Sequence, residues 1–166
     1  MEVRAATPDD ARAIAHVYNQ GIEDRVATFE TEPRTAGQVE QTLRRRMRTH
    51  PALVAERDGT LIGFAWVAPY SERPCYAGVG EFSVYIARDA RGQGVGRALV
   101  DALAEACRTE LFWKLVSRIF PENAASRALC RACGFREVGT HIRHAQLDGE
   151  WRDVLVVERL LGPLQP

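Results

Sequence analysis

Three glycines at alternate positions, in the segment "RGQGVG" from Arg91 to Gly96, separate a strand-like run from a strongly amphipathic stretch. The preceding "EFSVYIA" (residues 81–87) has the composition of a β-strand, and the following "RALVDALAEACR" has the apolar spacing of an α-helix. A strand, a glycine turn and a helix in this order aim free backbone N–H groups at one point, at the positive end of the helix dipole. The sequence therefore predicts an anion site, best suited to phosphate, with Arg91 and Arg97 beside it.

The glycine spacing excludes two common nucleotide motifs. A Walker loop requires a lysine and a hydroxyl residue after its last glycine, and the segment has neither. A dinucleotide fingerprint starting at Gly92 or Gly94 would need its third glycine at Arg97 or Leu99. A phosphate-bearing ligand of another kind and a plain strand-to-helix turn both stay open at this point.

The elements along the chain predict an α+β fold in one domain spanning residues 1–166. Asp-Gly pairs at 58–59 and 148–149 predict two hairpins, within residues 52–70 and 136–161. Further strands are expected at 2–6, 81–87 and 113–120, and helices at 7–22, 35–50, 94–109 and 123–135. The order β-α-α-β-β-β-α-β-α-β-β requires a mixed sheet with helices on both faces. The tail "GPLQP" is expected to fray.

Composition excludes several function classes. Lys plus Arg and Asp plus Glu both total 22, so no basic excess favours nucleic acid, and the run "LRRRMRTH" is best explained as a solvated helix face. No window approaches the roughly 20 apolar residues that span a bilayer, and the N-terminus has no signal-peptide pattern, so we expect a cytoplasmic protein without membrane contact. The four cysteines, with one C-x-x-C inside a helical pattern, lack metal-ligand spacing, and no metal is expected.

Several segments together resemble one family. "R-x-x-G-x-G" after "EFSVYI" looks like the acyl-CoA signature of the GNAT superfamily of N-acetyltransferases. Combined with "ATFETEP", "PENAASRAL" and "DGEWRDV", it resembles the branch acting on phosphinothricin, arsinothricin and methionine sulfone or sulfoximine. The resemblance covers nearly the whole chain. It implies the GNAT fold, acetyl-CoA as cosubstrate, and acetylation of the α-amino group of a small amino acid or glutamate-like analogue, in resistance or detoxification. It also implies a homodimer.

The resemblance implies the cofactor contacts position by position. The backbone of Val84, Tyr85 and Ile86 would pair with the pantetheine arm like an added strand. The turn would wrap the pyrophosphate of coenzyme A, through Arg91, Gly92, Gln93, Gly94, Val95, Gly96 and Arg97. Asn123 would contact the pantetheine region, with Ser126 near it. An N-cap role for Asn123 is an alternative, and both roles are compatible.

Acetyl transfer needs a base that takes a proton from the ammonium group of the acceptor. Glu81 is the candidate, because strand alternation puts it beside apolar neighbours that would raise a carboxyl pKa from about 4.3; the matching glutamate is the proposed base in the resembling family. A solvent-exposed strand-end glutamate is the alternative. The Val84 N–H would hold the oxyanion. The general acid stays open between Cys130, Tyr85 and unassisted departure of the thiolate.

On the acceptor side, the resemblance places Arg73 and Tyr76 in contact with the substrate. An arginine can hold a carboxylate in a bidentate fork, although a plain surface arginine is the alternative. Phe29 would form an apolar wall. Trp151 and Asp153 belong to the pocket, to a dimer contact or only to the hairpin. Alternative functions are acetylation of a protein N-terminus, lysine or polyamine, and non-catalytic acyl-CoA binding.

Overall fold

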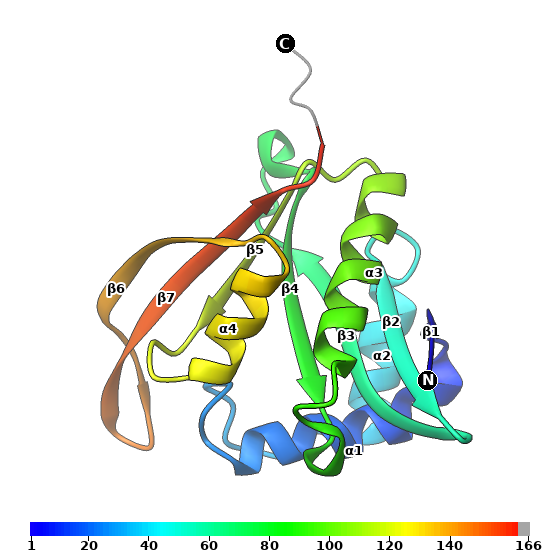
Figure 1. Ribbon diagram of the computed structural model, residues 1–166. Helices are drawn as coiled ribbons and strands as arrows, with labels where there is room; N and C mark the ends of the chain where they lie inside the picture. Colours follow the sequence, from blue (N-terminus) through cyan, green and yellow to red (C-terminus); the bar gives the residue numbers. More distant parts are fainter. Residues whose placement is uncertain (163–166) are drawn as a thin grey trace.

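Residues 1–162, which the computed structural model describes, fold around one seven-stranded β-sheet (Figure 1). The strands lie in the order β1-β2-β3-β4-β5-β7-β6, and only β4 and β5 run parallel within this described part. The strands are β1 (Glu2–Ala5), β2 (Ala52–Arg57), β3 (Thr60–Pro69), β4 (Val79–Ile86), β5 (Lys114–Ile119), β6 (Arg136–Leu147) and β7 (Glu150–Leu160). The predicted mixed sheet is confirmed. The end of the expected frayed tail, residues 163–166, lies outside the described residues.

Helices cover both faces of the sheet, as predicted. They are α1 (Ala11–Glu23), α2 (Ala36–Arg46), α3 (Val95–Thr109) and α4 (Ala124–Ala132). On one face, Tyr18 of α1 packs against Phe64 of β3 and Tyr85 of β4, with ring centroids 6.0 and 4.6 Å apart. On the other face, Leu99 of α3 approaches Gly63. Since neighbouring residues on a strand point to opposite faces, these contacts put α1 and α3 on opposite sides of the sheet.

Local signals account for the element boundaries. Both Asp-Gly pairs adopt positive φ, at 52° and 74° for Asp58 and Gly59 and at 50° and 82° for Asp148 and Gly149, which the two-residue hairpin turn requires. Thr35 caps α2, because its hydroxyl accepts the N–H of Gln38 at 3.2 Å.

Two helix predictions need adjustment. The first predicted helix begins with a 3-10 turn (Pro8–Asp10) before α1 starts at Ala11. In this turn the Asp10 carboxylate accepts the Thr7 N–H at 2.8 Å and both ends of the Arg4 guanidinium at 2.9 Å. The sequence predicts that the second helix continues to His50, but α2 ends at Arg46. Met47 therefore lies outside the buried stripe and is 40 % exposed.

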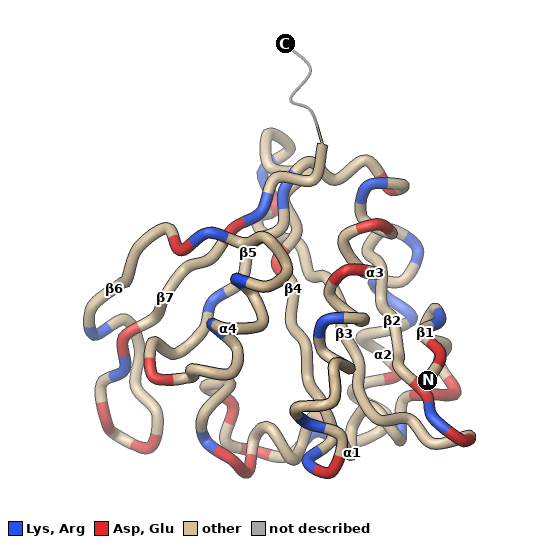
Figure 2. The backbone as a smooth tube through the Cα atoms, in the orientation of Figure 1, with Lys and Arg blue, Asp and Glu red and all other residues tan. Residues whose placement is uncertain are grey.

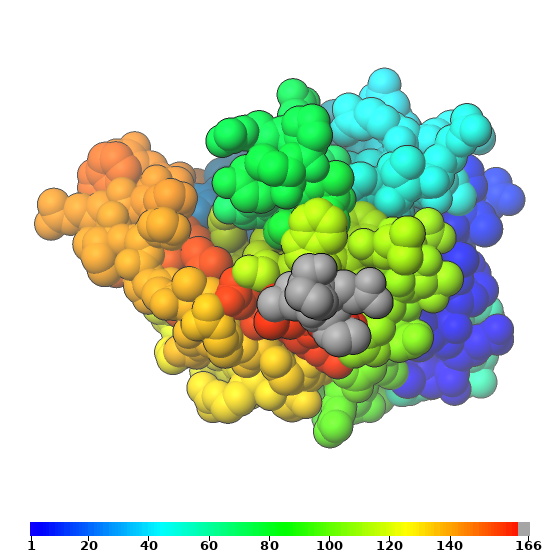
Figure 3. All heavy atoms as spheres, turned by 90° about the horizontal axis from the view of Figure 1, so that it is seen from above, coloured from blue at the N-terminus to red at the C-terminus, as the bar shows by residue number. Residues whose placement is uncertain are grey.

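The hairpin of β6 and β7 extends beyond the helix-covered core. β6 is exposed along most of its length, because it is the last strand in the sheet. Figure 3 shows this hairpin, in orange and red, standing out from the body of the molecule beside the green segment that joins β3 to β4. Within residues 1–162, no helix is long and apolar enough to cross a membrane.

Candidate active site

The parallel strands β4 and β5 separate soon after they meet, which opens the sheet (Figure 1). Their pairing covers only Val79–Glu81 opposite Lys114–Val116. At the point of separation the Ser117 hydroxyl donates to the carbonyl oxygen of Phe82 at 2.9 Å. Beyond it the inner edges of the two strands face a gap.

The backbone of β4 presents free donors to this gap. The Ala87 N–H donates to the carbonyl of Ile62 at 2.9 Å, which fixes the direction of the β3–β4 ladder. Bonding direction alternates along an antiparallel strand, so the N–H groups of Tyr85 and Ser83 also face β3. Those of Val84 and Ile86 therefore face the opening. This arrangement suits both the predicted pairing with an extended arm and an oxyanion contact at Val84.

The glycine turn closes one end of the gap. Gly92 and Gly94 have φ of 73° and 81°, the left-handed region that glycine adopts without strain. Gly94 is the N-cap of α3 and offers no side chain to its first turn, so the N–H groups there are available to an anion. A cavity of about 430 Å³ lies against the turn. Its lining includes Val84, Tyr85, Ile86, Arg91, Gly92, Gly94, Val95, Gly96, Arg97, Asn123, Ser126 and Leu129.

The polar side chains of the turn have partners of their own. Arg91 lies 2.7 Å from the Asp24 carboxylate at the end of α1, and Arg97 lies 3.6 Å from Asp101. Gln93, predicted as a cofactor contact, turns its amide to the carbonyl of Asp89 at 2.7 Å and to Arg57, and it is absent from the described lining of the cavity.

Asn123 connects the second β–α junction with the α1–α2 loop. Its Oδ1 accepts the Ser126 N–H at 3.0 Å, the N-cap bond that the sequence suggested for α4. Its Nδ2 donates to the carbonyl of Val26 at 3.0 Å. The residue also lines a narrow slot of about 50 Å³ between β4 and β5, together with Ser83, Ser117, Arg118, Leu129 and Cys130. The slot shares six lining residues with the larger cavity, so the two are continuous.

Glu81, the predicted base, lies at the last β4–β5 pair before the gap, and its surroundings differ from those predicted. Its carboxylate accepts a hydrogen bond from the Arg118 guanidinium at 3.0 Å. Glu81 is the only charged residue of β4, and the rest of the strand is tan in Figure 2. The sequence pattern predicted apolar neighbours, whereas the structure places a charged partner, Arg118 of β5, beside the carboxylate.

The two candidate acids are both withdrawn from water. The Tyr85 ring lies beneath α1, stacked on Phe64 at 5.4 Å, and burial raises the pKa of its hydroxyl well above the usual range. Cys130 borders the slot from α4, and burial raises the pKa of its thiol to about 12. Neither group is a ready proton donor near neutral pH.

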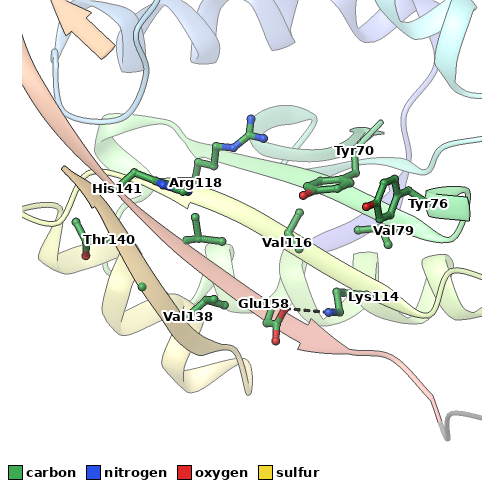
Figure 4. Close-up of a pocket in the computed structure, with 12 residues that line it drawn as sticks. Tyr70, Tyr76, Val79, Lys114, Val116, Arg118, Val138, Thr140, His141 and Glu158 are labelled. Atoms are coloured by element: carbon green, nitrogen blue, oxygen red, sulfur yellow. Dashed lines mark hydrogen bonds and ion pairs between the residues drawn. The ribbon is translucent and has the colours of Figure 1, made fainter. Parts of the chain in front are cut away.

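A second cavity, of about 420 Å³, lies on the face of the sheet beyond the slot (Figure 4). The predicted acceptor residue Tyr76 lines it, next to Tyr70, with ring centroids 5.5 Å apart. Lys114 and Glu158 form an ion pair at 3.0 Å in its floor. The other lining residues are Val79, Val116, Arg118, Val138, Gly139, Thr140, His141 and Val156.

The other predicted acceptor residues, Arg73 and Phe29, do not line this cavity among the described residues. Arg73 is exposed with its guanidinium over the Tyr76 ring, 5.8 Å from the centroid, and is absent from the described lining. Phe29 packs edge-on against Phe120, with centroids 4.9 Å apart. The Asp153 carboxylate accepts the Arg143 N–H at 2.8 Å, which supports the bulge of β6, and Trp151 is exposed on the hairpin.

Arg118 is the residue that the sequence interpretation missed. It lines both the slot and the second cavity, and it pairs with Glu81. The run "WKLVSRIF" identifies a strand, but a lone arginine in it gives no sign of its partner, because the register of β5 against β4 is set by tertiary packing.

Comparison with known proteins places this arrangement in a family. Residues 1–136 match the family described as acetyltransferase (GNAT) domain. The chain belongs to the GNAT acetyltransferases. The phosphinothricin N-acetyltransferase of Alcaligenes faecalis is 35 % identical to this acetyltransferase over 162 residues, covering 96 % of the chain and 82 % of the relative. The L-methionine sulfoximine/L-methionine sulfone acetyltransferase of Pseudomonas paraeruginosa is 30 % identical, with coverages of 97 % and 95 %.

Solved structures share the fold of the acetyltransferase. A ribosomal-protein-alanine N-acetyltransferase from Brucella melitensis has a TM-score of 0.93 and 35 % identity, over 96 % of this chain and 99 % of that one. A phosphinothricin acetyltransferase from Sinorhizobium meliloti, in complex with acetyl-CoA, has a TM-score of 0.91 and 29 % identity, over 97 % and 88 %. The predicted GNAT fold is confirmed.

Proposed function

We propose that the protein transfers the acetyl group of acetyl-CoA to the α-amino group of a small amino acid or glutamate-like analogue of the phosphinothricin, arsinothricin or methionine sulfone/sulfoximine type, in resistance or detoxification. One observation carries the proposal: the turn cavity, the slot and the second cavity follow one another, and Glu81 pairs with Arg118, the residue that lines both the slot and the second cavity. The named activities of the Alcaligenes and Pseudomonas relatives support the acceptor class.

Acetyl-CoA fits the first two cavities. The N–H groups of the first turn of α3 and the positive φ of Gly92 and Gly94 suit a pyrophosphate, which needs several donors around one centre. The gap-facing N–H group of Ile86 suits an amide carbonyl of pantetheine, which leaves the N–H of Val84 for the thioester oxygen. The Sinorhizobium structure, solved with acetyl-CoA, supports the same cosubstrate here.

The transfer balances with the groups present. Glu81 takes a proton from the acceptor ammonium, and the neutral amine attacks the thioester carbonyl carbon. The Val84 N–H donates to the oxyanion that develops on the carbonyl oxygen. A C–N bond forms, the C–S bond breaks, and coenzyme A leaves as thiolate while the nitrogen gives up its second proton to water.

We propose that no side chain protonates this thiolate during departure. An ordinary thiol has a pKa of about 8.5, so a donor with the Cys130 pKa of about 12 would give up its proton unfavourably by roughly 5 kcal/mol. The hydroxyl of Tyr85 is excluded by the same argument, since its pKa is also raised. Water at the open slot supplies the proton after the bond breaks.

The test is a thiol-release screen with acetyl-CoA and a panel of amino acids and analogues. We expect acidic amino acids or their analogues to accelerate release above the hydrolysis background. Glu81→Gln should lower turnover roughly a hundredfold, as expected for loss of a general base. If no member of the panel accelerates release, the acceptor class is wrong; if Glu81→Gln keeps full turnover from pH 6 to 9, Glu81 is not the base.

A second candidate keeps the chemistry and changes the acceptor to a protein N-terminus. The activity named for the Brucella protein, ribosomal-protein-alanine N-acetylation, favours it. Incubating the protein with acetyl-CoA and a cell extract, followed by mass spectrometry, distinguishes the two, because only a protein acceptor gains 42 Da on an N-terminal residue. A net charge of zero and the cationic side chain of Arg118 at the second cavity do not favour a lysine or polyamine acceptor.

The proposal includes a cytoplasmic homodimer. The exposed apolar side chains Val138, Ile142 and Trp151 on the β6–β7 hairpin support self-association, because water-exposed apolar patches favour contacts between proteins. Sedimentation equilibrium should give twice the chain mass of 18.5 kDa.

A further inference from the structure

Arg118 occupies the one position shared by the slot and the second cavity. The two linings have no other residue in common among those described. Its side chain is 48 % exposed and extends from β5 away from the Lys114–Glu158 ion pair (Figure 4). One of its five N–H groups bonds to Glu81. The others are available to a second acceptor of hydrogen bonds at the cavity.

Once Glu81 has taken a proton, no other carboxylate at the second cavity neutralises Arg118 among the described residues. Lys114 is neutralised by Glu158, which also pairs with Arg136. Arg118 is neutralised only by Glu81 among the described carboxylates. When Glu81 accepts a proton its carboxyl becomes neutral, and a half-buried guanidinium is left facing the cavity. A half-buried unpaired charge is unfavourable, so an anion at this point would compensate it.

We propose that Arg118 binds the acidic side-chain group of the acceptor and is a specificity-determining residue. The carboxylate, phosphinate or arsinate oxygen of the bound acceptor replaces Glu81 as the hydrogen-bond partner of the guanidinium. Glu81 is thereby released to take the ammonium proton. Binding of an acidic acceptor is thus coupled to activation of the base. This inference rests on the proposed function and adds the residue that distinguishes acidic from neutral side chains.

The test compares two acceptors of similar length in the full-length protein. Phosphinothricin carries an anionic phosphinate, and methionine sulfone is neutral at the same place; both keep the α-carboxylate. Thiol release gives kcat and KM for the wild type, Arg118→Gln and Arg118→Lys. Arg44→Gln is the control, because it removes an exposed arginine whose ion pair with Glu40, at 2.8 Å, lies on α2.

For phosphinothricin we expect Arg118→Gln to lower kcat/KM by about 10- to 100-fold, mainly through KM, as for a lost hydrogen bond between charged groups. Arg118→Lys should recover part of the loss. For methionine sulfone, kcat should not fall, because the variant leaves Glu81 free. Arg44→Gln should leave kcat and KM unchanged for both acceptors.

Three outcomes would overturn the inference. Equal rises in KM for both acceptors would mean that Arg118 binds the α-carboxylate, and an equal fall in kcat would mean that it only positions Glu81. Unchanged constants would remove it from the site. If neither acceptor nor any other amino acid drives thiol release in the wild type, the proposed function itself fails, and this inference with it.

Discussion

At the residue scale, the chemistry depends on which groups can hold or lose a proton between β4 and β5. Burial keeps the thiol of Cys130, on α4, protonated, with a pKa raised to about 12. Glu81 has instead a charged partner and partial access to water. The thiol next to the slot is therefore a poor acid, and the carboxylate paired with Arg118 is the group that we propose as the base.

We predict that Cys130→Ala keeps kcat within about threefold of the wild type, because unassisted departure of the thiolate needs no acid. Loss of buried volume should still lower the free energy of unfolding by about 1 kcal/mol. Cys133→Ala is the matched control, since that thiol is similarly buried, with a pKa raised to about 11, but does not line the slot among the described residues. A fall in kcat beyond about thirtyfold in Cys130→Ala alone would identify the thiol as the acid.

The limits of sequence interpretation are also clearest at single residues. The proposed cofactor residues of the turn follow from glycine spacing and from the resemblance, because the backbone conformation is encoded locally. The ion pair between Glu81 and Arg118 joins residues 37 positions apart. Its geometry depends on the angle at which two strands diverge, which no local pattern encodes. The placement of Gln93, turned away to Asp89, is likewise decided by neighbours outside the motif.

At the element scale, the strands and helices were predictable because each carries its own signal. Asp-Gly turns, capping residues and apolar periodicity located every strand and α-helix of the described chain to within a few residues. What no element encodes is the short β4–β5 pairing, three residues long, that opens the sheet. Parallel pairing is a tertiary property, set by how α3 and α4 pack on one face.

The close packing of α1 on β4 can be tested by substituting Gly21. A Cβ at Gly21 would lie 2.7 Å from the Tyr85 ring, which is itself held by Tyr18 and Phe64. We predict that Gly21→Ala lowers the free energy of unfolding by about 1 to 3 kcal/mol through overpacking. Chemical denaturation would measure the change.

Gly37→Ala provides the matched control. Gly37 lies exposed in α2, and the nearest neighbour of an added Cβ is the Thr35 hydroxyl, at 3.9 Å. We expect a gain of up to about 1 kcal/mol, because alanine restricts the unfolded chain and favours helix. If Gly21→Ala were equally stabilising, the contact between α1 and Tyr85 would not be as tight as described.

The start of the first helix should contribute stability that depends on pH. Hydrogen bonds from Arg4 lower the pKa of Asp10 below its ordinary value of 3.8. A lowered pKa means that the stabilisation is complete above the ordinary value and is lost as pH falls through the folded-state value. We predict that Asp10→Asn costs about 1 kcal/mol at pH 7. The difference from the wild type should shrink steadily below about pH 4 in urea titrations, and a difference independent of pH would rule out the ion pair as its source.

At the scale of the whole molecule, the cavity at the glycine turn, the slot and the second cavity form one path through the opened sheet. The path separates two chemical environments. Backbone donors and a helix N-terminus border the end proposed for the cosubstrate, and charged and aromatic side chains line the end proposed for the acceptor. The slot between them has a volume of only about 50 Å³.

Binding in this opening should stabilise the entire fold, because α3, β4 and the β5–α4 junction all border it. We predict that acetyl-CoA at 100 times its Kd adds about 2.7 kcal/mol to the free energy of unfolding and raises Tm in proportion. Thermal denaturation across a concentration series measures both the shift and the Kd.

Gly94→Ala should weaken that response. An added Cβ meets no atom within 4 Å, so the whole effect of the substitution comes from φ of 81° at the N-cap of α3. Strain of roughly 1 to 2 kcal/mol would lower Tm without ligand if the turn keeps its conformation. If the turn instead distorts, the Kd for acetyl-CoA should rise by about 5- to 30-fold. A variant with wild-type Tm and an unchanged shift would show that the turn does not hold the pyrophosphate. If acetyl-CoA raises the Tm of the wild type but not that of Gly94→Ala, cosubstrate binding depends on this left-handed glycine. The substitution leaves Glu81 and Arg118, the proposed acceptor-side residues, unchanged.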